Sequence, residues 1–268
     1  MKLHGRWCGW PFVLLCAMLL ACGGGEESDG DVSAKDADSG LPEERTYAGF
    51  SSEGGEWTFL LEPAAWSLTF SKGNDAPMTR HYDLEDKAPL KFFLRVKDQG
   101  GELFGWEKPG RFLLHAFPLG TDKPSMFAAI GETAPAAPAL VAGSYLWLEA
   151  GAAGDAGTPT FPAWGILTLS AEGAWSRWSF GTPAAEGGGI APDSYTDAWP
   201  PASSPEAVGA WTQVAGTGKI TLADGKTQLP GRVWTEEGTA VLVLQTESGM
   251  IVGVRAPEQP YVNSDLVN

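Results

Sequence analysis

The sequence predicts an all-β protein whose antiparallel hairpins form two β-sandwich or small β-barrel modules. Three observations support this fold class. Short runs rich in β-branched and aromatic residues recur after Tyr47. Glycine-containing and acidic turn signals separate many of these runs, and no segment keeps a helical hydrophobic period between caps. The spacing of the runs suits a sandwich or barrel better than β-α-β units.

The expected strands fall into two groups. The first group comprises EWTFLLE, WSLTF, LKFFLRV, RFLLHAF and MFAAI. The second group comprises GSYLWLEA, WGILTL, AWSRWSF, AWTQVAG, KITL, GRVW, TAVLVLQ and MIVGVR. A proline-alanine stretch, residues 132–140, separates the groups and predicts a linker between an N-terminal module, 47–131, and a C-terminal module, 141–268.

A long segment rich in proline and glycine, 181–207, interrupts the second group. Its strand propensity is low. Long loops in compact domains are often functional, so we expect a binding surface here before elsewhere.

The first 21 residues have the anatomy of an export signal. Lys2 and Arg6 give a basic start, and an apolar run follows from Trp10 to Leu20. That run is shorter than the ~20 apolar residues that a membrane-spanning helix needs. Ala21 is the small residue that such signals place before the cleavage point.

Leu19-Leu20-Ala21-Cys22 resembles the lipobox of bacterial lipoproteins. The resemblance implies cleavage between Ala21 and Cys22, a diacylglycerol thioether on the Cys22 sulfur and an acyl chain such as palmitate on its amine. It further implies attachment to a membrane of the cell envelope. Gly23 stands where an aspartate commonly retains such proteins in the inner membrane, which favours the outer membrane. The alternatives are an ordinary secretory signal, or lipidation at Cys16, which Leu15 rather than a small residue precedes.

Residues 22–46 read as the lipidated cysteine followed by an acidic, disordered tether. Within it, DADSG only superficially resembles a calcium loop, because Leu41 stands at the sixth position, where glycine is required.

The charge balance bears on the class of partner. Losing residues 1–21 removes two basic residues and no acidic one, which lowers the formal net charge from -15 to -17. We therefore expect no nucleic acid partner, since basic residues supply affinity for phosphate backbones. The membrane contact is expected through the lipid alone, and the other partner, an envelope protein or a glycan, stays open.

Cysteine and histidine counts limit the chemistry. Cys8 and Cys16 leave with the signal and Cys22 is lipidated, so we expect no disulfide, thiolate metal site or cysteine nucleophile. His81, in TRHYDLED, is expected on an exposed loop, and His115, in FLLHAF, on a strand. We accordingly predict no metal, no cofactor and no enzymatic activity.

Two other motifs match their templates poorly. Around Ser51 and Ser52 the G-x-S-x-G pattern of serine hydrolases is incomplete, and QVAGTGKIT departs from a phosphate-binding loop at Gln213 and Ile220. The second segment reads as a hairpin. A carboxylate-dependent hydrolase acting on envelope polysaccharide stays a lesser alternative, because sequence spacing does not reveal carboxylate separation.

Tryptophan is the remaining candidate for ligand binding. Trp175, Trp199 and Trp211 are the residues we select, and Trp199 is the best exposed candidate because prolines follow it. Gly209-Ala210-Trp211 resembles the G-x-W start of lipocalins, which implies a barrel that carries an apolar ligand. The expected function is thus a non-catalytic envelope lipoprotein with a binding or structural role, the alternative being a lipocalin-like or carbohydrate binder.

Overall fold

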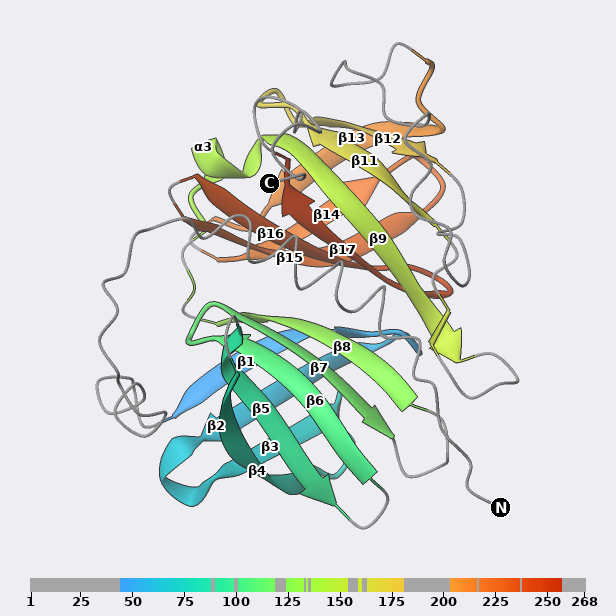
Figure 1. Cartoon of the computed structure of the whole chain (residues 1–268). Coiled ribbons are helices and arrows are strands. Elements are labelled where there is room, and N and C mark those ends of the chain that lie inside the picture. Colours follow the sequence, from blue (N-terminus) through green and yellow to red (C-terminus); the bar gives the residue numbers. More distant parts are fainter. Residues whose placement is uncertain are drawn as a thin grey trace, which may run out of the picture.

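The computed structural model describes residues 44–87, 90–98, 101–118, 124–132, 134, 136–153, 159–160, 163–180, 203–215, 217–236 and 238–256. These residues form strands β1–β17, the single-turn 3-10 helix η1 (Pro63–Ala65) and the single-turn helix α3 (Pro138–Val141) (Figure 1). Every strand pairing is antiparallel. The predicted all-β class with antiparallel hairpins is confirmed.

The first barrel is a closed meander in which each strand pairs with the next and β8 returns to β1. Its strands are β1 (Arg45–Ser51), β2 (Glu56–Glu62), β3 (Ser67–Lys72), β4 (Met78–Lys87), β5 (Leu90–Asp98), β6 (Gly101–Lys108), β7 (Phe112–Pro118) and β8 (Pro124–Gly131). Closure leaves no free sheet edge in this ring.

The second barrel closes through β9, which pairs with both β11 and β17. Its strands are β9 (Gly143–Ala153), β11 (Trp164–Leu169), β12 (Ala174–Ser179), β13 (Ala207–Gln213), β14 (Lys219–Ala223), β15 (Gln228–Glu236), β16 (Thr239–Gln245) and β17 (Gly249–Arg255). The short β10 (Pro159–Thr160) pairs with the far end of β9.

Side-chain alternation fills each barrel with its own core. On β2 the even-numbered Thr58 is exposed, whereas Trp57, Phe59 and Leu61 point inward. These join Tyr47 of β1 and further buried residues of the first interior: Leu68, Phe70, Leu113, Phe127 and Ala129. The second interior is packed in the same way, by a set that includes Tyr145, Trp147, Leu167, Trp175, Leu222 and Leu242.

Glycine permits the closure of the first barrel. A Cβ on Gly49 of β1 would lie 2.0 Å from the carbonyl oxygen of Ala128 on β8, a distance that no real side chain adopts. The two strands therefore approach each other only because residue 49 lacks a side chain.

A third apolar core lies between the two barrels. Outward residues of the first barrel meet outward residues of the second in one cluster of buried side chains. Its members are Phe50, Phe112, Leu114, Met126, Ala128, Ile130, Ala134, Ala150, Trp234, Val241, Val243, Met250, Val252 and Val254. We call this cluster the shared core.

Strands that border the shared core are buried on both faces. On β8, Met126, Ala128 and Ile130 enter the shared core, while Phe127 and Ala129 enter the first interior. On β16, Val241 and Val243 enter the shared core, and their neighbours enter the second interior. This double burial explains the uninterrupted apolar runs MFAAI and TAVLVLQ.

The closing seams of both barrels lie at this contact. The first barrel closes between β1 and β8, the second between β9 and β17, and residues of all four strands contact the opposite barrel. Figure 1 shows β1, β7 and β8 on the side of the first barrel that faces β15, β16 and β17. Each seam is therefore covered by the neighbouring barrel.

Ion pairs flank the shared core. Arg232 on β15 donates to the Glu56 carboxylate on β2 at 2.8 Å, and the Lys108 ammonium lies 3.3 Å from Glu236. The same Lys108 ammonium stands 4.7 Å from the centre of the Trp234 ring. Charged side chains thus border the apolar contact from both barrels.

The strand boundaries correct several expectations. β1 begins at Arg45, two residues inside the predicted tether 22–46, because Arg45 is buried with a charged partner inside the barrel. Helix α3 occupies the end of the predicted linker 132–140, and β13 begins at Ala207, the last residue of the predicted loop 181–207. Strands β1, β4 and β6 and the short β10 were not among the predicted strands.

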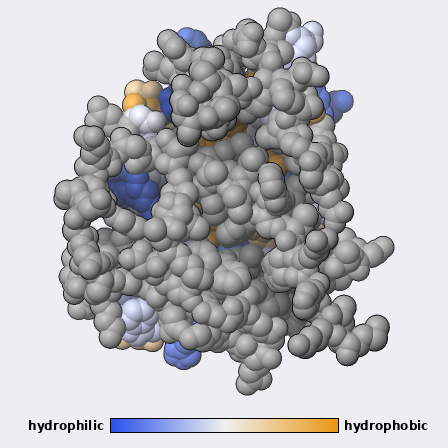
Figure 2. Space-filling model, in the orientation of Figure 1, coloured by the Kyte–Doolittle hydropathy of each residue, from blue (hydrophilic) through white to orange (hydrophobic). Residues whose placement is uncertain are grey.

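The described surface carries few exposed apolar side chains. Figure 2 shows hydrophobic atoms over α3, whose Leu140 is 41% exposed. The other large ones are Met78, Val208 and Val214. Among the described helices, none has the length and apolar content needed to span a bilayer.

Placing a charge in the shared core should destabilise the whole body. In Val243→Asp an unpaired carboxylate would be buried, and we expect the free energy of unfolding to fall by at least about 3 kcal/mol. Urea denaturation followed by tryptophan fluorescence measures this. The matched control is Val208→Asp on β13, where the valine is 55% exposed and the expected change is within about 0.5 kcal/mol. Equal losses in the two variants would contradict a tightly packed contact.

Candidate functional site

The sequence-predicted site residues fall in three different environments. Ala21, Cys22 and Trp199 lie outside the described residues. Trp175 of β12 is buried in the second interior, and its indole N–H donates to the carbonyl of Ala223 at 3.1 Å. Trp211 of β13 is half-buried against the same core, and its indole N–H donates to the carbonyl of Ser170 at 2.9 Å. The barrel therefore brings Trp175 and Trp211 together as interior side chains.

Strand alternation separates Trp175 from Trp178. Trp175 points inward, while Trp178 lies on the outer face of β12. The indole N–H of Trp178 donates to the carbonyl of Ser203 at 2.8 Å, which holds the segment before β13 against β12.

The two histidines differ in burial. His81 is exposed on strand β4, which corrects its expected place on a loop. His115 is fully buried on β7, opposite Gly105 of β6. A Cβ on Gly105 would lie 2.1 Å from the His115 ring, so the glycine makes room for the imidazole.

Ser51 and Ser52 have structural contacts. The Ser51 hydroxyl accepts from the indole N–H of Trp57 at 3.1 Å and donates to the carbonyl of Gly54. The Ser52 hydroxyl accepts from the backbone N–H of Met126 at 3.0 Å. Both serines are fully buried.

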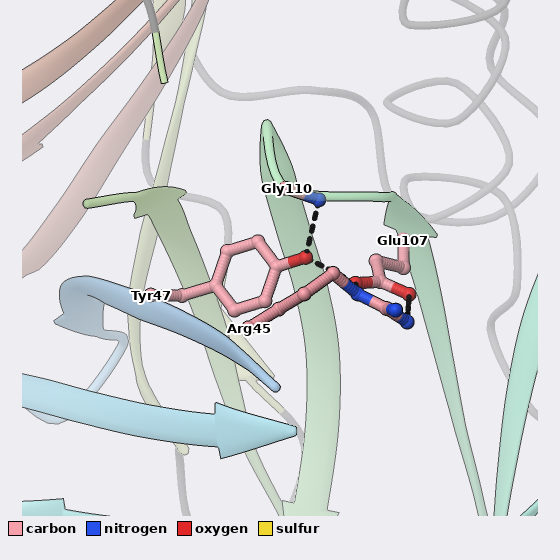
Figure 3. Close-up of polar contacts among 4 residues, drawn as sticks. All are labelled: Arg45, Tyr47, Glu107 and Gly110. Carbon is pink, nitrogen blue, oxygen red and sulfur yellow. Dashed lines mark hydrogen bonds and ion pairs between the residues drawn. The ribbon is translucent and has the colours of Figure 1, made fainter. Parts of the chain in front are cut away.

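An ion pair is buried inside the first barrel (Figure 3). The Arg45 guanidinium donates twice to the Glu107 carboxylate, from Nε at 2.8 Å and from Nη2 at 3.0 Å. The Tyr47 hydroxyl donates to Glu107 Oε1 and accepts from the backbone N–H of Gly110 at 2.7 Å. We call Arg45, Tyr47 and Glu107 the buried polar cluster.

Strand geometry assembles this cluster from distant parts of the chain. Arg45 and Tyr47 share the inward face of β1, because they alternate with Thr46. On β6 the inward Glu107 alternates with Trp106, which packs against the shared core. The turn after β6 then brings the N–H of Gly110, a residue with φ 67, to the tyrosine oxygen.

Burial sets the chemistry of the cluster. Arg45 is 5% exposed, and Tyr47 and Glu107 are 0% exposed. Burial, the nearby Glu107 charge and the hydrogen bond to Glu107 raise the pKa of the Tyr47 hydroxyl far above its usual range, while Gly110 and Arg45 act in the opposite direction. A solute in water does not reach these groups, so the arrangement serves as a tie across the barrel rather than as a reaction centre.

Sequence reasoning missed this cluster. Arg45 was assigned to the tether, and Glu107 lies 62 positions further along the chain. The available signal was the alternation Arg-Thr-Tyr, which places two polar-headed side chains on one strand face.

A shallow groove of about 350 Å³ lies on the outer side of β1–β3. Four of its eight lining residues carry a hydroxyl group, and two of these hydroxyls, Thr58 Oγ1 and Ser71 Oγ, are hydrogen-bonded to each other at 2.9 Å. The lining residues are Glu44, Thr46, Thr58, Phe59, Leu60, Thr69, Phe70 and Ser71. The described part of the chain holds no group of three or more histidine, cysteine, aspartate or glutamate residues arranged to bind a metal ion.

No protein-family model matches this chain, and no curated protein matches it either.

Removing one partner of the buried ion pair should lower the free energy of unfolding far more than removing both partners. Arg45→Met leaves the Glu107 charge buried and unpaired, and we expect a loss of about 3–5 kcal/mol in the free energy of unfolding. The double variant Arg45→Met with Glu107→Leu should lie within about 2 kcal/mol of wild type. Urea denaturation of the single and double variants checks this. Arg111→Met is the control, because its 4.0 Å pair with Glu236 is part-exposed and should contribute about 0–1 kcal/mol.

Tyr47 should make the protein less stable at alkaline pH. Its raised pKa means that the folded state keeps a proton that the unfolded chain releases above about pH 10, so stability falls as the pH rises. In Tyr47→Phe we expect this decline to be shallower, by up to about 1.4 kcal/mol per pH unit. Urea denaturation between pH 8 and 11 measures the slopes. A residual decline is expected from Tyr145, whose pKa is also raised by burial, and identical slopes in both proteins would refute the assignment.

Proposed function

We propose that the protein is a lipid-anchored envelope protein whose double-barrel body has a non-catalytic binding or surface role. The observation that carries the proposal is Leu19-Leu20-Ala21-Cys22 after a basic start and an apolar run. Acyl chains on Cys22 would hold the protein to a membrane, since each buried CH₂ contributes ~0.8 kcal/mol. The outer membrane is the proposed location, because Gly23 follows the cysteine.

The tether and the body support a role at a distance from the lipid. Residues 23–44 separate Cys22 from β1, and a fully extended chain of that length reaches about 75 Å. The shared core joins the two barrels, so both would move together at the end of this tether.

The packing of both barrels favours ligand contact at the surface over an enclosed apolar chamber. The interior positions contributed by β1–β3 and by β14–β17 carry large side chains that are almost completely buried. The groove on β1–β3 combines four hydroxyl side chains, which can donate to and accept from the hydroxyls of a glycan, with apolar side chains that can contact its ring faces. An envelope glycan is thus the partner class that the described surface supports.

Replacing Cys22 should abolish lipid attachment. In cells fed a radiolabelled or alkyne-tagged palmitate, we expect the wild type to be labelled and recovered with membranes, and Cys22→Ser to be unlabelled. Cys16→Ser is the matched control and should be labelled as the wild type is, because Leu15 precedes that cysteine. Label on Cys22→Ser, or none on the wild type, would refute the anchor.

A further inference from the structure

Arg177 points into the second barrel. It shares the inward face of β12 with Trp175, two residues before it, and it pairs across the strands with Leu167 of β11. Both neighbours belong to the interior core. Arg177 itself is part-exposed, so its side chain lies where the interior meets solvent.

Arg177 differs from the other arginines whose side chains the structure describes. Five arginines donate to carboxylates or carbonyls or form an ion pair: Arg45, Arg80, Arg111, Arg232 and Arg255. Arg177 has no carboxylate partner among the described residues, and its Nε, like that of Arg232, is buried without an acceptor there. Arg232 differs because its Nη2 donates to Glu56. The chain carries 33 acidic residues, so the missing acceptor does not reflect a shortage of acid.

A second donor without an acceptor belongs to a neighbouring side chain. The guanidinium carbon of Arg177 lies 5.6 Å from the centre of the Trp147 ring on β9. Trp147 is 3% exposed, and its indole N–H likewise has no acceptor among the described residues. A buried donor without an acceptor is costly, and here two such donors belong to side chains that are in contact.

The inward face of β9 carries one carboxylate, and its Oε1 accepts two hydrogen bonds from residues between β16 and β17. Glu149 accepts from the Ser248 hydroxyl at 2.8 Å and from the Thr246 hydroxyl at 3.2 Å. It forms no ion pair with Arg177 in the described structure. Glu149 is part-exposed, as Arg177 is.

The opposite end of the second barrel is closed. Val141 of α3 is fully buried in the interior core, and the Tyr145 hydroxyl donates to its carbonyl at 2.5 Å. Arg255 donates to the carbonyls of Leu140 and Ala142. Among the described residues, no comparable cover lies over the end that holds Arg177 and Trp147.

We propose that this end of the second barrel binds the carboxylate group of a small ligand. Arg177 Nε–H and Trp147 Nε1–H are the donors, and the planar guanidinium matches the two oxygens of a carboxylate. A carboxylate carries one negative charge, whereas phosphate near neutral pH carries up to two. The net charge of -15 repels the second charge more strongly, so the carboxylate is the favoured oxyanion. The site does not rest on the lipid anchor.

The test is a titration of the full chain, labelled with ¹⁵N on its tryptophan indoles, in detergent solution. Acetate probes the group alone, butyrate adds an apolar tail, and inorganic phosphate is the competing oxyanion. Trp147→Phe identifies the Trp147 N–H signal by its loss. We expect acetate or butyrate to shift this signal, with butyrate the tighter binder if the natural ligand has an apolar tail.

Variants assign the effect to Arg177. Arg177→Gln should weaken carboxylate binding at least about tenfold, and Arg177→Lys, which keeps the charge but loses Nε–H, should weaken it less. Arg111→Gln removes the same charge from a surface pair and should bind as the wild type does. No shift with either carboxylate, a shift with phosphate alone, or equal weakening in Arg177→Gln and Arg111→Gln would overturn the proposal. The spectra also report folding, and Arg177→Lys carries the test if Arg177→Gln unfolds.

Discussion

The shared core is the constraint on which the rest of the structure depends. Strands β8 and β16 are apolar on both faces, so neither barrel has a water-compatible surface there without the other. Each large side chain in this contact, such as Phe50 or Trp234, stabilises the body by about 1.5–3 kcal/mol through burial. The two rings are therefore one folded unit, and the ion pairs Arg232–Glu56 and Lys108–Glu236 at its border only refine the fit.

The two interiors differ in whether their arginine side chain has a carboxylate partner. In the first barrel, the carboxylate of Glu107 meets the guanidinium of Arg45, the Tyr47 hydroxyl and, through it, the Gly110 N–H. Those donors and acceptors complete one another, and the group is sealed from water. In the second barrel, Arg177 and Trp147 present two donors with no acceptor in the described structure. The buried ion pair of the first barrel is thus hydrogen-bonded within the barrel, whereas Arg177 and Trp147 of the second barrel each keep a donor without an acceptor in the described structure.

Much of the fold was readable from local pattern, and its limits have physical causes. Runs such as MFAAI and TAVLVLQ are unmistakable strands, since their β-branched and apolar content admits little else. β4, MTRHYDLEDK, was missed because six of its residues are charged or histidine, and β6 because two glycines interrupt it. The sequence did not reveal which element covers each apolar strand face. Alternation shows that a face is buried, but not what packs against it.

The site residues show the same limit. Arg45 was placed in the tether because a charged residue beside acidic sequence is usually solvated, and only a partner 62 positions away reverses that expectation. From the sequence alone, Trp175 and Trp211 could have been core or surface residues, and the strand pairing in the barrel places both side chains in the interior.

Each barrel closes at a seam that the opposite barrel covers, between β1 and β8 in the first and between β9 and β17 in the second. The order of synthesis therefore matters for folding. The first ring is completed at Gly131, long before β17 emerges, and its apolar seam then has no cover. Until the second ring closes, the uncovered apolar seam of the first ring is therefore a site where the unfinished molecule can mispair.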